Sequence, residues 1–301
     1  MRIGIDLGGT KIELVMLDSN GDVCHRERVP TPRDDYQRTL DAIAGLVERA
    51  ESTVGHAASV GIGTPGAISP ATGLIKNANA TALNANPLDV DLSRRLGREV
   101  RTANDANCFA LSEAWDGAGA DAETVFGVIL GTGTGGAVVV HRRVLRGPNA
   151  IAGEWGHNPL PWPTDDERPG PRCYCGRAGC IERFLCGPAL EEQYANAAGL
   201  RCAAADIVRR AEQGDEMAGS ILDRYEDRLA RALAHVINML DPDTIVLGGG
   251  LSHIGRLYAN VPNLWSRWVY SDTVRTQLCP PVHGDAGGAR GAAWLWGDES
   301  G

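Results

Sequence analysis

The sequence predicts an α/β protein built from two domains. Short apolar segments typical of strands alternate with segments whose apolar residues recur at helical spacing. Two hairpin-like segments, one at the N-terminus and one near the middle, each carry a Gly-Thr pair at the turn. The chain has 301 residues, which is longer than most single domains. Together these features favour two related halves.

Charge and composition argue against several classes of binding partner. The net charge of −9 and a pI near 5.3 disfavour nucleic acids and anionic membranes, which an acidic surface cannot neutralise. We find no apolar run of membrane-spanning length and no N-terminal signal segment. The eight cysteines show no spacing typical of a disulfide framework. We therefore expect a cytoplasmic protein with no membrane partner.

The first hairpin is a candidate phosphate site. Residues 2–7 and 12–17 read as strands joined by a glycine turn. Gly8 and Gly9 carry no side chain, so backbone N–H groups there can approach a phosphate, and Thr10 adds a hydroxyl. Asp6 ends the first strand, where it could hold a hydrated magnesium ion. The alternative is a structural turn that binds nothing.

The next segments alternate helix, strand and loop. Residues 41–54 place apolar side chains on one helical face, and residues 60–63 form a short strand that ends at a turn containing Gly66. The loop of residues 76–84 is rich in asparagine, and an amide such as Asn79 suits the recognition of hydroxyl groups. Asparagines that only satisfy turns are the alternative.

Asp105 is a candidate catalytic carboxylate. A short strand at residues 100–103 ends at Asn104 and Asp105, and a helical segment at residues 109–115 could begin at the same point. A carboxylate between a strand end and a helix start is a frequent catalytic location in α/β folds. The alternative is that Asp105 caps the helix.

A second glycine turn follows the strand predicted at residues 124–130. Gly131, Gly133 and Gly136 match the dinucleotide pattern G-x-G-x-x-G, but that pattern must open a helix, and β-branched strand residues follow at 137–140. The segment is therefore strand, glycine turn, strand, as in the first hairpin. Two such turns from two related halves imply a nucleotide held in a cleft between domains.

Residues 153–182 form a predicted zinc loop. The spacing of its ligand-type residues is Cys-x-Cys-x4-Cys after an upstream histidine, which gives the set His157, Cys173, Cys175 and Cys180. Three thiolates and one imidazole make a closed tetrahedral set that builds structure and activates no water. Glu154 and Glu182 flank the set and could pair with the hydroxyls of a polar ligand. The alternative to zinc is a set of ordinary buried thiols with a nearby surface histidine, and the alternative for the two glutamates is that they are solvated surface residues.

The C-terminal part reads as core elements with one more glycine turn. Residues 218–240 and 287–296 are helical, and residues 244–247 form a buried strand followed by glycines at positions 248–250. Gly249 and Gly250 suggest a close approach of the backbone to the adenine or ribose of a nucleotide. The proline-rich residues 161–171 are the most linker-like stretch and are expected to be a surface loop.

These motifs together resemble the ROK family of bacterial sugar kinases over essentially the whole chain. The resemblance is carried by residues 6–11, 104–105, 131–133 and 153–182. Within the family, residues 76–79, 158–162 and 173–176 are most similar to fructokinase/mannokinase. Residues 104–116 are at least as similar to N-acetylglucosamine kinases.

The resemblance implies an α/β, actin-like ATPase fold of two ribonuclease-H-like domains flanking a cleft. The first domain would comprise residues 1–117 and 287–301, and the second, with the zinc loop, residues 118–286. The implied reaction is ATP-dependent phosphorylation of a hexose at its primary hydroxyl, D-fructose to fructose 6-phosphate. The alternatives are another sugar (N-acetylglucosamine, glucose or mannose), a non-enzymatic sugar or nucleotide sensor, and an actin-like ATPase. A homodimer is the family expectation.

The resemblance also assigns roles to residues. Asp105 would be the base that takes the proton of the attacking hydroxyl, although an ordinary aspartate, with a pKa of about 3.9, is a weak base that mainly orients this group. ATP, magnesium near Asp6 and zinc are the implied cofactors. The positions expected to bind the sugar are Gly66, Asn79, Asn104, Asp105, Glu154, His157 and Glu182. The positions expected to bind the nucleotide are Gly4, Asp6, Gly8, Gly9, Thr10, Lys11, Thr132, Gly133, Thr134, Gly135, Gly136, Gly249 and Gly250.

Overall fold

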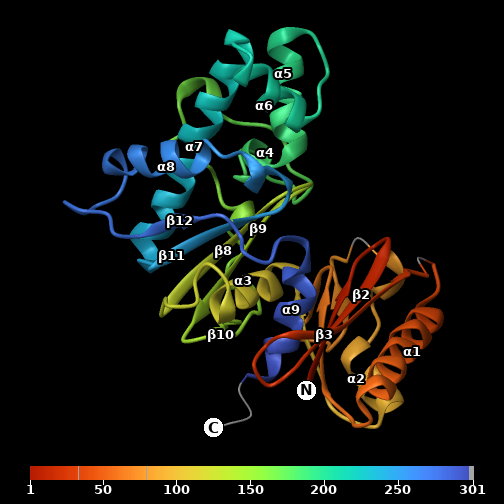
Figure 1. The fold of residues 1–301 in the computed structure, drawn as a ribbon. Coiled ribbons are helices and arrows are strands. Elements are labelled where there is room, and N and C mark those ends of the chain that lie inside the picture. The colour runs from red at the N-terminus through yellow and green to blue at the C-terminus, as the bar shows by residue number, and fades with distance from the viewer. Residues whose placement is uncertain (33, 79, 298–301) are drawn as a thin grey trace. The chain divides into compact units, whose positions relative to one another are not determined.

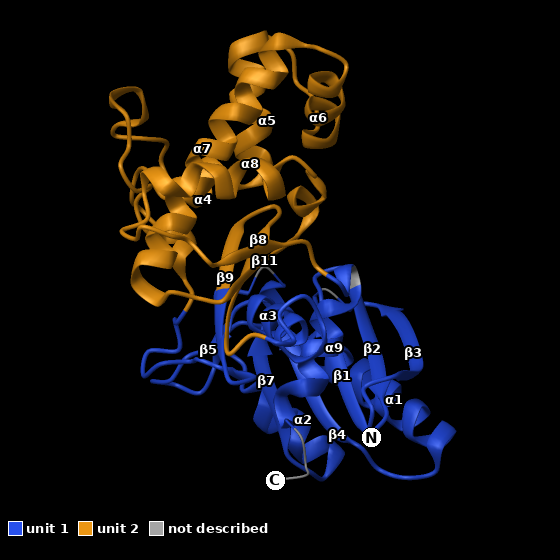
Figure 2. Cartoon of the chain, turned by 60° about the vertical axis from the view of Figure 1, so that its left-hand side comes forward, with its two compact units in different colours: residues 1–121, 137–152, 282–301 blue, residues 122–136, 153–281 orange. Residues whose placement is uncertain are grey.

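The structure is a computed structural model that describes residues 1–32, 34–78 and 80–297. The chain forms two compact units (Figure 2). The first comprises Met1–Asp121, Ala137–Ala152 and Val282–Gly301, and the second Ala122–Gly136 and Gly153–Pro281. Compact units need not coincide with domains, so the domain boundaries expected near residues 117 and 287 stay a prediction.

The first unit contains a five-stranded mixed sheet whose order is β3-β2-β1-β4-β7. The antiparallel pairs are β1 with β2 and β2 with β3, and the parallel pairs are β1 with β4 and β4 with β7. Four of these strands were predicted. The bounds are β1 Arg2–Leu7, β2 Lys11–Leu17, β3 Val23–Pro30, β4 Ser59–Thr64 and β7 Val100–Asn104.

Helices cover both faces of this sheet (Figure 1). Side chains of a strand alternate between faces, so Ile3 and Ile5 of β1 join the core with α1, while Gly4 faces α9. Helix α1 is longer than predicted because Asp35 caps it and accepts from the N–H of Arg38 at 3.0 Å. The bounds are α1 Tyr36–Val54, α2 Leu88–Leu96, α3 Asp105–Asp116 and α9 Gly287–Ala293, which a 3-10 turn continues to Trp296.

Glycines bring α9 close to the sheet. A Cβ on Gly4 would overlap the carbonyl oxygen of Ala289, and a Cβ on Gly61 of β4 would overlap that of Ala292. Gly4 was expected to bind nucleotide. The structure gives it a packing role, and its nucleotide role stays a prediction.

A second five-stranded sheet has the order β10-β9-β8-β11-β12, with β8, β11 and β12 parallel. In the second unit, the long helix α7 packs against α4, α5, α6 and α8. Its buried Leu222, Leu229 and Leu233 recur at helical spacing, as predicted. The strand bounds are β8 Thr124–Leu130, β9 Thr134–Val140, β10 Arg143–Val144, β11 Thr244–Gly248 and β12 Gln277–Cys279. The helix bounds are α4 Glu182–Leu185, α5 Gly187–Ala198, α6 Ala204–Glu212, α7 Glu216–Leu240 and α8 Leu257–Leu264.

The proline-rich segment at residues 161–171 is anchored rather than linker-like. Its Glu167 is buried and forms ion pairs with Arg228 and Arg231 of α7, at 2.7 and 2.9 Å. Arg231 also donates to the carbonyl of Trp162 at 2.8 Å. Most residues of this segment are exposed or half-buried, as expected of a surface loop. Its attachment to α7 was not predicted, because the sequence does not show which arginines a distant glutamate meets.

Over the residues that the structure describes, none of the helices combines the length and apolar character needed to cross a membrane.

Candidate functional site

Two carboxylates lie together in the first unit. Asp6 is near the end of β1, and Asp105 is the first residue of α3, directly after β7. Burial, and then the charges of Asp105 and Glu13, raise the pKa of Asp6 from 3.8 to about 6, while the charge of Lys11 opposes this shift. A buried carboxylate beside a second carboxylate can bind a proton or a divalent cation that prefers oxygen ligands, such as magnesium.

Asp105 is an exposed residue. The protein atoms around its carboxylate nevertheless desolvate the charged form, which raises its pKa. Its Oδ1 accepts from the N–H of Ala106 at 2.8 Å, which acts in the opposite direction. A carboxylate with a raised pKa is a better proton acceptor than an ordinary aspartate.

Asn104, not Asp105, caps helix α3. The Asn104 Oδ1 accepts from the backbone N–H of Asn107 at 2.7 Å. The alternative reading of Asp105 as the helix cap was therefore wrong. Because Oδ1 of Asn104 already has this partner, any contact of Asn104 with a sugar hydroxyl is expected through its amide nitrogen.

The glycine turn between β1 and β2 is tied to the chain after β3. Gly8 donates to the carbonyl of Lys11 at 3.0 Å, and the hydroxyl of Thr31 donates to the carbonyl of Gly8 at 2.7 Å. Gly8 and Gly9 are partly exposed, and Thr10 is exposed. The turn is thus both fixed and accessible, as a phosphate-binding backbone requires.

Gly66 and the asparagine-rich loop have structural roles. Gly66 has φ of +86°, and a Cβ there would overlap the carbonyl oxygen of Lys76. Asn84 accepts from the N–H of Ala78 and donates to the carbonyl of the same residue, each at 2.9 Å. Asn79 lies outside the described residues. Sugar contacts from this loop stay a prediction.

The glycine turn of the second unit is shorter than predicted. Strand β9 already begins at Thr134, so the turn comprises residues 131–133. A Cβ on Gly136 would lie 2.7 Å from the indole of Trp155, which gives that glycine a packing reason. Thr132 and Gly133 remain in the turn, whereas Gly135 lies in the strand and its carbonyl accepts from the Trp155 indole at 2.9 Å.

This turn is held from two sides. The N–H of Gly187, at the start of α5, donates to the carbonyl of Gly131 at 2.8 Å. On the other side, Oε2 of Glu182 accepts from the N–H of Thr134 at 3.1 Å. Glu182 was expected to bind sugar; the structure gives one of its oxygens a backbone partner.

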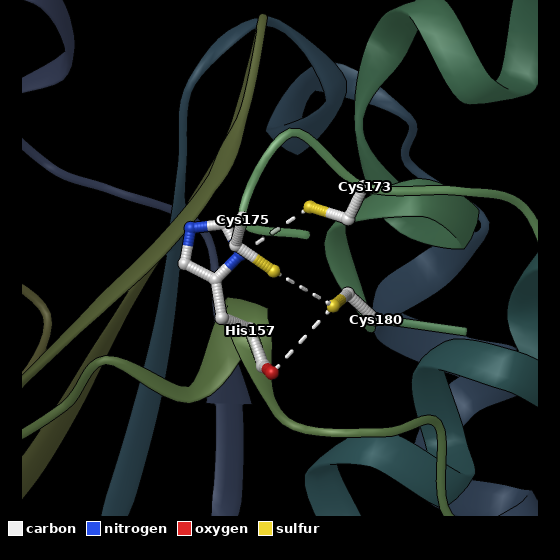
Figure 3. Close-up of side chains that lie close together, drawn as sticks. All are labelled: His157, Cys173, Cys175 and Cys180. Atoms are coloured by element: carbon white, nitrogen blue, oxygen red, sulfur yellow. Dashed lines mark hydrogen bonds between the residues drawn. The ribbon is translucent and has the colours of Figure 1, made fainter. Parts of the chain in front are cut away.

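The predicted zinc ligands converge (Figure 3). The ligand atoms of His157, Cys173, Cys175 and Cys180 all lie within 4.8 Å of one another. The sulfurs of Cys175 and Cys180 are 3.6 Å apart, and Nδ1 of His157 is 3.5 Å from the sulfur of Cys173.

These separations fit a tetrahedral zinc ion. Zinc–sulfur bonds of about 2.3 Å at tetrahedral angles place two sulfurs roughly 3.8 Å apart. A disulfide would instead need about 2.05 Å. The three thiols and one imidazole also form a complete zinc ligand set, with no position left for water.

Backbone hydrogen bonds shape the loop around these ligands. Cys173 donates to the carbonyl of Arg177 at 2.8 Å, and Leu160 donates to that of Gly179 at 2.9 Å. Gly176 and Gly179 both have positive φ, as a tight loop requires. These two glycines let the chain curl back so that the cysteine sulfurs face one centre.

His157 also contacts a residue that sequence reasoning missed. Its Nε2 lies 3.0 Å from the hydroxyl of Tyr174, and the two rings meet edge to face. Desolvation raises the pKa of Tyr174, and the negative charge of Glu182 and, more weakly, that of Glu154 raise it further. The only signal in the sequence is that Tyr174 stands between two cysteine ligands.

The glycines after β11 differ from each other. Gly249 has φ of +80°, and a Cβ there would lie 2.5 Å from the carbonyl oxygen of Leu130. Around Gly250 a Cβ would meet open space. Gly249 is thus explained by packing, and Gly250 is the better candidate for a ligand contact.

Comparisons with known proteins identify relatives over the full chain. A sequence profile described as ROK family matches residues 2–299. N-acetyl-D-glucosamine kinases from Pectobacterium atrosepticum and Escherichia coli are both 42% identical over 299 residues, covering 98% of this chain and 98% and 99% of theirs.

Solved structures agree with this relationship. A ROK hexokinase from Thermus thermophilus has a TM-score of 0.88 at 31% identity, with 98% of this chain and 97% of that chain covered. A ROK family glucokinase from Streptomyces griseus, in complex with glucose and AMPPNP, has a TM-score of 0.74 at 29% identity, with 98% of both chains covered.

Proposed function

This chain belongs to the ROK family and has its actin-like ATPase fold, and we propose that it is an N-acetyl-D-glucosamine kinase. It is a sugar kinase that uses ATP. The observation that supports the choice of sugar is 42% identity, over nearly the whole chain, to kinases of that name. D-fructose, the sugar first expected, has less support than this alternative.

Asp105 is the proposed base. It would accept the proton of the primary hydroxyl as that hydroxyl attacks the terminal phosphate of ATP. Two observations support this role: Asp105 is an exposed residue at the start of α3, and its raised pKa makes it a better acceptor than an ordinary aspartate. Asn104 would donate its amide N–H to a sugar hydroxyl.

The nucleotide would be bound through backbone N–H groups. We propose the turn at Gly8, Gly9 and Thr10 in the first unit and that at Thr132 and Gly133 in the second, with Lys11 and Gly250 nearby in their own units. Magnesium, which neutralises phosphate charge when bound, would be held through Asp6, whose raised pKa reflects burial and neighbouring acidic side chains.

The zinc loop would support the sugar-binding side chains. Glu154, His157 and Glu182 are the proposed contacts with sugar hydroxyls, and zinc would fix the backbone that carries them. Zinc at the set of His157 and three cysteines is itself a proposal, which the fit of the ligand separations supports.

The cellular location and the oligomeric state are proposed from the cysteine content and from the family. We propose a reducing, cytoplasmic location, since all eight cysteines are free. A homodimer stays the family expectation, and a small sugar is the proposed partner.

A coupled ADP-release assay over a panel of sugars tests the proposal. N-acetylglucosamine should give the highest kcat/KM, above glucose, mannose and fructose. Glucose is the second candidate, because the Streptomyces griseus glucokinase structure contains glucose. A clear preference for fructose would overturn the choice of sugar, and no sugar-dependent ADP release would overturn kinase activity.

A further inference from the structure

The two ring nitrogens of His157 face different partners. Nδ1 is 3.5 Å from the sulfur of Cys173, on the side of the proposed zinc ion. Nε2 is 3.0 Å from the hydroxyl of Tyr174, and the two ring centroids are 5.1 Å apart at an interplanar angle of 88°. The tyrosine therefore contacts the nitrogen that the cysteines do not.

Zinc binding imposes a requirement on the nitrogen that faces away. A neutral imidazole carries its proton on one nitrogen, so a metal at Nδ1 requires the proton at Nε2. The Nε2–H then needs an acceptor, because the partner of this N–H orients the ring and fixes its tautomer. The Tyr174 hydroxyl oxygen lies at the distance of such an acceptor.

Hydrophobic burial does not explain the position of the Tyr174 ring. The residue is 83% exposed, so its ring gains little from the hydrophobic effect. Tyr174 makes two contacts with His157, one hydrogen bond and one edge-to-face ring contact. Tyr174 therefore stands between two cysteines of the proposed ligand set in the sequence and contacts the histidine of the same set in the structure.

We propose that Tyr174 is a positioning residue for the zinc loop. Its hydroxyl accepts the Nε2–H of His157 and holds the ring so that the Nδ1 lone pair faces the metal. The proposal rests on the proposed zinc site and goes beyond it, because it assigns a residue that is not a ligand. It also means that a sugar hydroxyl reaching Nε2 must share or replace the tyrosine hydroxyl.

The test compares zinc affinity in the purified full chain. Tyr174→Phe removes only the hydroxyl, and Tyr270→Phe, at a tyrosine that is 99% exposed in the same unit, is the matched control. Competition with a colorimetric chelator should show zinc bound roughly 10-fold more weakly in Tyr174→Phe, at the lower end of the 10–100-fold typical of such outer contacts. Tyr270→Phe should match the parent.

A second readout reports the hydrogen bond of the His157 Nε2–H. In zinc-loaded protein labelled with ¹⁵N-histidine, the parent should show a protected Nε2–H signal from His157 that Tyr174→Phe loses to fast solvent exchange. Tyr174→Leu, which also removes the ring contact, should weaken zinc at least as much. Either an unchanged zinc affinity or an unchanged Nε2–H signal in Tyr174→Phe would overturn the proposal.

Metal analysis of the parent separates the two levels of failure. If the parent binds no zinc, the proposed zinc site and this inference both fall, while the sugar panel still tests kinase activity. If the parent binds zinc and Tyr174→Phe binds it equally well, only the role of Tyr174 falls.

Discussion

The carboxylate of Glu182 accepts a hydrogen bond from the backbone N–H of Thr134, with Oε2 and N 3.1 Å apart and both buried. Glu182 follows the proposed zinc ligand Cys180 by two residues, and Thr134 is the first residue of β9 after the glycine turn. One side chain therefore joins the proposed zinc loop to the proposed phosphate-binding turn within the second unit.

Removing this acceptor should destabilise the fold. Glu182→Ala leaves a buried N–H without its partner, at a cost of about 1–3 kcal/mol in the free energy of unfolding. Glu182→Gln keeps an acceptor oxygen and should lose less. Urea denaturation measures both, with the exposed Glu212→Ala as the control. Equal stability of Glu182→Ala and the parent would contradict the contact.

Gly133→Ala should disturb the same hydrogen bond from the other side. A Cβ at Gly133 would lie 2.7 Å from Oε2 of Glu182, so the glutamate must shift away from Thr134. We expect Gly133→Ala to cost about as much as Glu182→Ala, and the double variant to cost less than the sum. Gly219→Ala in α7, where a Cβ meets open space, should be neutral or slightly stabilising. Full additivity in the double-mutant cycle would show that the two residues do not share this contact.

Asp6 should make stability depend on pH. Its pKa is raised from 3.8 to about 6 in the folded state, so the fold binds the extra proton between these values. The contribution of Asp6 to the free energy of unfolding is therefore largest below about pH 4, and this contribution is lost as the pH rises through about 6. In magnesium-free buffer at pH 8, Asp6→Asn should be more stable than the parent by up to about 3 kcal/mol, since each pKa unit corresponds to about 1.36 kcal/mol.

The advantage of Asp6→Asn should shrink as the pH is lowered toward 4, which urea denaturation at several pH values measures. The exposed Asp272→Asn is the control. An Asp6→Asn variant that is no more stable than the parent at pH 8 would show that the carboxylate is already compensated.

Glu167 should be essential to the anchored segment at residues 161–171. Its partners Arg228 and Arg231 are buried, and their hydrogen bonds help hold its pKa near 2 despite desolvation. Glu167→Ala leaves two buried guanidinium groups without this partner, at a cost of about 3–5 kcal/mol. Asp166→Ala, at the exposed neighbouring residue, should cost far less, because solvent screens an exposed ion pair. Similar losses in the two variants, measured by urea denaturation, would contradict the role of the buried pairs.

Much of the fold could be predicted from the sequence because its signals are local. The β1–β2 hairpin and α7 follow from apolar periodicity, and the cluster of His157 with three cysteines follows from cysteine spacing. Strand β3 was missed because it is largely solvent-facing and reads as charged residues, such as Arg26 and Arg28 around the buried Glu13.

The missed features depend on residues far apart in the chain. The fully buried Glu113 of α3 accepts from the backbone N–H groups of Val282 and His283, at 3.0 and 3.1 Å, and from that of Ala118 at 2.9 Å. The length of the second glycine turn was wrong because Gly136 serves the packing of Trp155. No local pattern identifies such partners.

The turnover of Asp105→Asn with N-acetylglucosamine tests the central claim most directly. The substitution keeps the shape of the side chain and removes its ability to accept a proton. In the ADP-release assay, kcat should fall roughly 10²–10⁴-fold, while KM for the sugar stays close to that of the parent. An Asp105→Asn enzyme whose kcat equals that of the parent would contradict the account.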